Sequence, residues 1–193
     1  MKKIMFNDKY GLTQAVLEGR KTMTRRAVSA HIHKKASLYR QEYFDDTLDA
    51  LFVEDSLLTF SPFKPDEVVA VAQPYRDIRD IIGDIQDGKS IKFMAGWNNK
   101  MFVRADLMPH QIRIMNVRVE RLQDISDEDC LKEGVYWDYG DYPYMATKMF
   151  KYDGKEEFIH PKAAFASLID KVSGKGTLES NPWVFVYEFE LVK

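Results

Sequence analysis

The C-terminal segment 183–192 is the part of the sequence that most constrains the fold. Bulky side chains alternate along it with smaller or acidic ones, in the order Trp183, Val184, Phe185, Val186, Tyr187, Glu188, Phe189, Glu190, Leu191 and Val192. A period of two predicts a β-strand, because successive side chains of a strand point to opposite faces of its sheet. This is the clearest strand in the chain.

Two further segments have the character of strands. Residues 68–72 are a continuous apolar run between Pro65 and Pro74, which predicts a buried strand. Residues 112–121 alternate apolar and polar side chains, with a break near Met115 and Asn116 that predicts a β-bulge. The basic stretch 20–28 contains alternating threonines, which favours an extended segment.

Capping signals and apolar spacing predict several helices. A first helix over about 8–18 has Asn7 as its N-cap and Gly19 after its end. A short helix runs from Ser126 to Gly134, and a longer one begins at Pro161 and ends near Gly174. Segment 37–60 is predicted to be a peripheral helical insertion, and the aromatic stretch 136–154 a long loop or a hairpin.

The order of these elements indicates the fold class. Strands that are not regularly separated by helices favour an α+β or mainly β fold, such as a small β-barrel flanked by helices. A length of 193 residues is that of one domain, so we expect a single domain over 1–193 with the insertion at about 37–60.

The composition excludes several classes of protein. Apolar residues make up 45% and charged residues 30% of the chain, which is enough for a core. No run reaches the roughly 18 apolar residues of a membrane span, and Asn7 and Asp8 interrupt any N-terminal signal sequence. Cys130 is alone, so no disulfide framework is expected. We therefore expect a cytoplasmic protein that has no membrane partner.

Positive charge is concentrated near the N-terminus. The whole chain has a net charge of −2, but residues 1–40 hold ten Lys and Arg against two acidic residues, a net charge of +8. Lysine and arginine attract nucleic-acid phosphates, which makes RNA a candidate partner. An ordinary solvated face is the alternative.

Within the basic block, Lys21 and Thr24 carry the most specific chemistry. A threonine hydroxyl can act as a nucleophile when a neighbouring lysine is kept neutral by burial or by nearby cations such as Arg20, Arg25 and Arg26. If Lys21 is exposed, it stays protonated and binds anions instead.

Other candidate ligand contacts lie further along the chain. Trp97, Asn98 and Lys100 combine a stacking surface, an amide and a cation, as single-stranded RNA recognition does. His110 precedes a strand and could point into a cleft. No glycine-rich phosphate loop is present. The spacing of His31 and His33 predicts two imidazoles on one face of a strand, but no further ligands lie near them in the sequence, so we expect no metal and no cofactor.

Several of these residues together resemble the ASCH family, a branch of the PUA-like β-barrels, and its phage and prophage members in particular. The resemblance spans almost the whole chain, in eight matching segments. They are Phe6-Asn7, Gly19 to Arg26, Glu67 to Gln73, Trp97, Met108-Pro109, Val117 to Ile125, Glu133-Gly134 and Asn181 to Val184. The resemblance implies a closed barrel flanked by helices, with a cleft for RNA or modified nucleosides.

One branch of the family hydrolyses the acetyl amide of N4-acetylcytidine, with a lysine and a threonine that match Lys21 and Thr24. Its third catalytic residue is a glutamate at the end of a strand, where this chain has Gln73. A neutral amide cannot act as a general base, although it can hydrogen-bond a ligand. Gln73 therefore favours binding over hydrolysis.

We accordingly expect a protein that binds RNA or a modified nucleoside, with Arg20, Lys21, Arg25 and Arg26 on phosphate and three further residues near a base, Thr24, Gln73 and Trp97. The alternative is an amidohydrolase acting on an N4-acylated cytidine-type nucleoside, with Lys21, Thr24 and Gln73 as candidate catalytic positions and a carboxylate from Glu67 or Asp77. A second alternative is a phage-encoded protein-interaction module that uses the acidic segment 41–60 and the aromatic segment 136–152.

Overall fold

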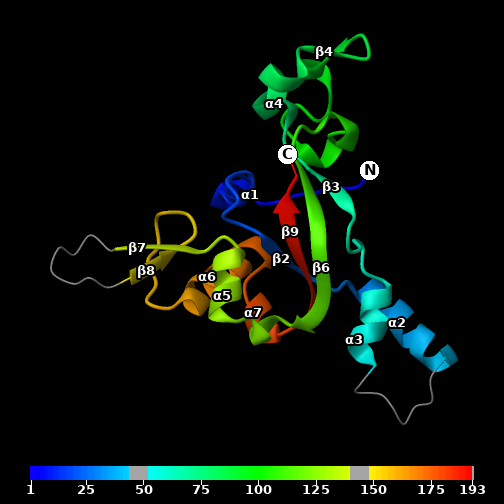
Figure 1. Cartoon of the computed structure of the whole chain (residues 1–193), viewed down its shortest axis with the longest axis vertical. Coiled ribbons are helices and arrows are strands. Elements are labelled where there is room, and N and C mark those ends of the chain that lie inside the picture. The colour runs from blue at the N-terminus through cyan, green and yellow to red at the C-terminus, as the bar shows by residue number, and fades with distance from the viewer. Residues whose placement is uncertain (44–51, 140–147, 193) are drawn as a thin grey trace.

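A five-stranded sheet forms the centre of the molecule (Figure 1), in a computed structural model that describes residues 1–43, 52–139 and 148–192. Its strands run in the order β1-β3-β6-β9-β2. Their bounds are β1 Lys3–Ile4, β2 Met23–Ala27, β3 Val68–Val71, β6 Gln111–Arg121 and β9 Trp183–Leu191. β1 and β3 are parallel, whereas the other neighbours are antiparallel.

The two longest strands, β6 and β9, pair along their whole lengths at the middle of this sheet. The alternation in 183–192 and the strand character of 112–121 are both confirmed. The register of the pair shifts between Ile114 and Asn116, so the predicted bulge is also present. The bulge lets β6 keep apolar side chains on the core face on both sides of the irregularity.

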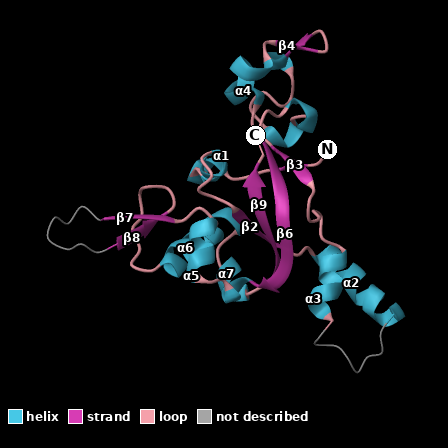
Figure 2. Cartoon of the chain, in the orientation of Figure 1, coloured by secondary structure: helices cyan, strands magenta, loops and turns pink. Residues whose placement is uncertain are grey.

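Helices pack around the sheet and complete the main core (Figure 2). α1 (Leu12–Leu17) follows a 3₁₀ turn that Asn7 caps, α5 (Asp127–Lys132) is capped by Ser126, and α6 (Pro161–Ser173) has its proline in the first turn. α7 (Thr177–Ser180) leads into β9. Phe165 and Leu168 of α6 are buried in the same apolar cluster as the inner residues of the sheet. These helix predictions are therefore confirmed.

Residues 74–108 form a separate lobe that the sequence did not predict. It contains α4 (Tyr75–Ile82), the short ribbon β4 (Ile85–Gln86) and β5 (Lys89–Ser90), and three 3₁₀ turns. The lobe has its own small core around Tyr75, with Ile78, Ile91 and Met108. Gly96 packs so closely on Tyr75 that a Cβ atom there would lie 2.5 Å from the ring.

Two further helices correct the prediction of a peripheral insertion at 37–60, because they bury Ala36 and Leu57 in the main core. α2 spans Ala30–Tyr43 and α3 spans Val53–Thr59, so helical structure begins earlier than expected, and residues 44–51 lie outside the described part. His31 and His33 were expected on one face of a strand but lie in α2. Two positions apart on a helix, their side chains point in different directions.

The aromatic stretch is a hairpin, in which β7 (Tyr136–Tyr139) pairs with β8 (Lys148–Lys151). Residues 140–147 lie outside the described chain.

The α+β class is confirmed, and the central sheet is open in the described residues: no ladder joins its edge strands β1 and β2. A side chain connects these two edges instead, because the Arg26 guanidinium donates to the carbonyl of Met5 at 2.5 Å. None of the described helices is both long enough and apolar enough to span a membrane.

Candidate active site and ligand cavity

The basic stretch turns sharply from the end of α1 into β2. Gly19 adopts a positive φ of 72°, and the Lys21 amide donates to the carbonyl of Ala15 at 2.9 Å. This turn directs the Lys21 side chain into the protein, where the residue is 2% exposed. Lys21 is therefore buried, whereas the sequence alone left both a buried and an exposed lysine open.

Lys21 is paired with a carboxylate far away in the sequence. Its Nζ donates to Glu133 Oε2 at 2.6 Å and to the Glu133 carbonyl at 2.7 Å. Glu133 is itself 4% exposed and ends α5. The next residue, Gly134, has a φ of 102°, and a Cβ atom there would approach the Lys21 side chain at 3.6 Å. A glycine suits this position, because it accepts that backbone conformation and leaves room for the lysine.

Arg25 lies beside this pair and contacts three carboxylates. Its guanidinium is 2.7 Å from Glu120, 2.5 Å from Asp129 and 3.2 Å from Glu133. Burial opposes the charge of Arg25, but these acids outweigh it and raise the pKa of the guanidinium. Arg25 is therefore a permanently charged residue that holds β2, β6 and α5 together.

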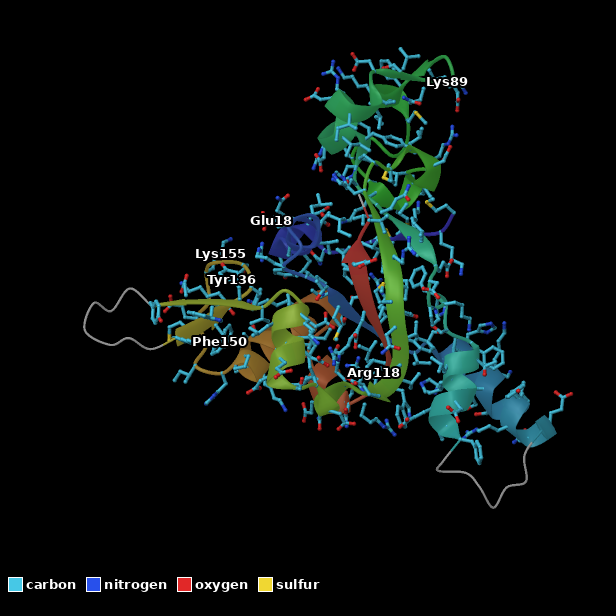
Figure 3. The ribbon with its side chains drawn as sticks, in the orientation of Figure 1. Glu18, Lys89, Arg118, Tyr136, Phe150 and Lys155 are labelled. Atoms are coloured by element: carbon cyan, nitrogen blue, oxygen red, sulfur yellow. The ribbon has the colours of Figure 1, made fainter. Side chains whose placement is uncertain are left out.

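Arg118 of β6, labelled in Figure 3, extends the network toward the surface. It donates to Glu120 at 3.0 Å and to Asp129 at 2.6 Å, and it also pairs with Glu188 of β9. The positive charges of Lys21 and Arg25 are thus already balanced within the protein.

Arg26 differs from its neighbours because no carboxylate lies within ion-pair distance of it among the described residues. Its bond to Met5 satisfies one nitrogen, whereas Nε is buried without a partner. Burial lowers the pKa of Arg26, since a charge is costly to remove from water. A partly buried cation whose Nε has no partner favours a bound oxygen acceptor.

These residues line a cavity of about 340 Å³, which we call the Lys21 cavity. One wall is polar and contains Lys21, Thr24, Arg25, Arg26 and Glu133. The apolar part of the lining is formed by Phe6 and Leu12 with Phe165, Leu168, Ile169 and Val172 of α6. A cavity of this size with few polar groups is typical of a small-molecule site.

Thr24 and Lys21 supply the reactive groups of the Lys21 cavity. Thr24 is 6% exposed, and within the described residues its hydroxyl has no hydrogen-bond partner. Burial lowers the pKa of Lys21, while the Glu133 carboxylate acts in the opposite direction. A free hydroxyl beside an amine that loses its proton more readily than usual can bind a carbonyl group or attack it.

Gln73 and His110 lie in another pocket, of about 440 Å³, between α1 and α4. They contact each other, with Gln73 Oε1 2.7 Å from His110 Nδ1. Neither residue lines the Lys21 cavity. The pocket that holds them, which we call the Gln73 pocket, is also lined by Asp77, one of the two carboxylates suggested from the sequence. The other, Glu67, pairs with Lys2 at 2.9 Å.

The remaining predicted contacts are dispersed. Arg20 is paired with Glu18 at 2.6 Å near the surface. Trp97 packs on the core of the 74–108 lobe, Asn98 accepts a hydrogen bond from Arg76, and Lys100 pairs with Asp8 at 2.7 Å. These four residues do not line the Lys21 cavity.

The structure thus brings together Lys21, Thr24, Arg25 and Arg26, and it adds Glu133, which the sequence did not identify as a site residue. The sequence marks Glu133 only as the last residue of a capped helix. Its partner Lys21 lies 112 positions earlier, so no local pattern links the two residues. Among the described residues, no three His, Cys, Asp or Glu side chains form a group that could hold a metal ion.

Comparisons with known proteins do not assign a family. No family model matches the chain, and no curated protein matches it. One solved structure, protein EF3133 from Enterococcus faecalis V583, described with the family model DUF984, aligns with all of this chain and 80% of its own, at 15% identity and a TM-score of 0.42. A TM-score below 0.5 does not establish a common fold.

Proposed function

We propose that this protein is an ASCH-type, PUA-like protein that binds a nucleoside or modified nucleoside in the Lys21 cavity. The observation that carries this proposal is the union of Thr24, Lys21 and Arg26 with the apolar wall of α6 in one small cavity. A nucleobase matches this arrangement, because it has apolar faces and an edge of hydrogen-bonding groups.

The charges in the cavity favour a small ligand over an RNA backbone. Arg20, Lys21 and Arg25 each have a carboxylate partner, so their charge is largely compensated before any phosphate arrives. Arg26 is the cation without such a partner in the described part of the site. It suits a carbonyl or another single oxygen of a ligand.

Hydrolysis of an acylated base is a second candidate, and Glu133 is the observation that favours it. Gln73, which stands where a catalytic carboxylate was expected, lies outside the Lys21 cavity. Glu133 instead supplies a carboxylate that contacts Lys21. In this reaction Lys21 first passes a proton to the Glu133 carboxylate, and the neutral amine then takes the proton of the Thr24 hydroxyl, whose oxygen attacks the amide carbon. The base leaves with a proton as its free amine, and water then hydrolyses the threonine ester.

A thermal-shift screen against nucleosides, including N4-acetylcytidine, tests both candidates when each mixture is also analysed by chromatography. We expect a rise in the melting temperature that Thr24→Val and Arg26→Gln abolish. Gln73→Ala is the matched control, because Gln73 lies in the other pocket. Stabilisation without a deacylated product supports binding, and a product that Thr24→Val removes supports hydrolysis.

The proposal is wrong if no nucleoside stabilises the protein, or if Gln73→Ala abolishes the effect while Thr24→Val leaves it intact.

A further inference from the structure

A third pocket, of about 590 Å³, lies between the N-terminal turn and the β7–β8 hairpin. We call it the hairpin pocket. Its lining residues are Lys9, Tyr10, Gly11, Gln14, Arg20, Tyr136, Trp137, Tyr152 and Asp153. None of them lines the Lys21 cavity, so the two sites are separate. Figure 3 labels Tyr136 on the hairpin and Glu18 just after α1, the two elements that face each other here.

Aromatic rings dominate this pocket. Four of its nine lining residues are Tyr10, Tyr136, Trp137 and Tyr152. Trp137 is 40% exposed and is fixed edge-on against Tyr139, with ring centroids 5.7 Å apart. Exposed, ordered aromatic rings are suited to stacking against a planar ligand.

Cations accompany the rings. The Arg20 guanidinium lies 5.5 Å from the Tyr136 ring, and the Lys9 ammonium lies 5.4 Å from the Tyr10 ring. Outside the pocket lining, Lys148 lies 4.0 Å from the Trp137 ring. Lys9 has no carboxylate at ion-pair distance among the described residues, whereas Arg20 is partly neutralised by Glu18. Lys9 and Lys148 are therefore the cations most available to an anionic group.

One carboxylate completes the pocket. Asp153 accepts the backbone N–H of Lys155 at 3.0 Å and forms no ion pair within the described residues. Its other oxygen is available to a donor such as a ribose hydroxyl or the amino group of a base. A simple anion would gain nothing from the rings, and an acidic peptide would be repelled by Asp153.

We propose that the hairpin pocket binds a nucleotide unit, with the base stacked on Trp137, the phosphate near Lys9, and a donor of the sugar or base on Asp153. Stacking rings combined with cations is the arrangement by which proteins bind nucleotides of single strands. The unit is either a free mononucleotide or part of a single strand. This proposal does not rest on the ligand of the Lys21 cavity.

The test uses the full chain with two probes, a mixed-sequence single-stranded RNA of about eight nucleotides carrying a fluorophore, and a set of nucleoside monophosphates. Binding is measured by fluorescence anisotropy and by isothermal titration calorimetry. We expect Trp137→Ala and Lys9→Gln each to weaken binding about fivefold or more, the lower end of the usual effect of losing a stacked base.

Two control variants match these substitutions on a distant surface. Phe93→Ala removes a ring that is 87% exposed, and Lys92→Gln removes an exposed lysine, both in the 74–108 lobe. Neither change should alter the affinity. Thr24→Val should also leave the hairpin pocket unaffected, so failure of the Lys21 proposal is distinguishable from failure of this one.

If both probes bind, the pocket is a site for free nucleotides. If only the RNA binds, it is a single-strand site. Both outcomes support the proposal. It is overturned if neither probe binds, or if Phe93→Ala and Lys92→Gln weaken binding as much as Trp137→Ala and Lys9→Gln do.

Discussion

Replacing Glu133 with glutamine should destabilise the protein strongly, because it leaves Lys21 charged, buried and without a carboxylate. Lys21 is 2% and Glu133 4% exposed, and their charged atoms are 2.6 Å apart. Removing one partner of a buried ion pair typically costs about 3–5 kcal/mol of the free energy of unfolding. We expect Glu133→Gln to fall in this range, since Arg25 keeps Glu120 and Asp129 but Lys21 keeps only the Glu133 carbonyl.

A double-mutant cycle distinguishes this explanation from a loss of packing. Lys21→Met removes the positive charge, so Glu133→Gln in that background no longer leaves a buried charge without a partner. The double variant should therefore lose less free energy of unfolding than the sum of the single variants, by at least about 1 kcal/mol. Urea unfolding followed by far-UV circular dichroism gives each free energy, with unchanged slopes showing that the unfolding process is the same.

Glu190→Gln is the matched control, because it makes the same substitution in an exposed pair, 3.9 Å from Arg113. Exposed ion pairs contribute little, so its urea midpoint should not change measurably. The reasoning is refuted if Glu133→Gln costs less than about 1 kcal/mol, or if the costs of the single variants simply add.

Three further predictions concern other parts of the molecule. Gly96→Ala should cost about 1–3 kcal/mol in urea unfolding, since its Cβ would lie 2.5 Å from the buried Tyr75 ring; a stability equal to the wild type would contradict that packing. Burial raises the pKa of Cys130 from 9.0 to about 12, so its thiol should resist a disulfide-exchange reagent until the protein unfolds. Because the unfolded thiol ionises first, its contribution to stability is complete below pH 9.0 and is lost as the pH rises toward about 12, as pH-dependent urea unfolding of wild type and Cys130→Ala can show. Arg26→Met should leave the melting temperature unchanged or raise it, because it removes a partly buried charge that has no carboxylate partner among the described residues, while it weakens nucleoside binding in the thermal-shift screen; a lower melting temperature would indicate that Arg26 is satisfied without a ligand.

The elements that the sequence predicted well are those whose signals are local. The alternation in 183–192, the apolar run 68–72 and the proline at the start of α6 each determine an element without distant contacts. The 74–108 lobe has no such signal, since short 3₁₀ turns leave no period in the sequence. His31 and His33 were misplaced because a two-residue spacing was taken for a strand.

Part of the site was predictable, and the rest depends on contacts between distant segments. Lys21, Thr24 and Arg26 stand close together in the chain and share the Lys21 cavity. The charges of Lys21 and Arg25 suggested a phosphate-binding surface, because the acids that compensate them come from α5 and β6, about a hundred positions later. Gln73 was expected with them, but it contacts His110 in a different pocket.

The most direct test of the central claim is a crystal structure of the protein with the nucleoside that gives the largest thermal shift. The account predicts density for the ligand in the Lys21 cavity, with an oxygen or nitrogen within hydrogen-bonding distance of Thr24 Oγ1 and an oxygen facing Arg26. Density in the Gln73 pocket instead, or a Lys21 cavity that stays empty at saturating ligand, would contradict it.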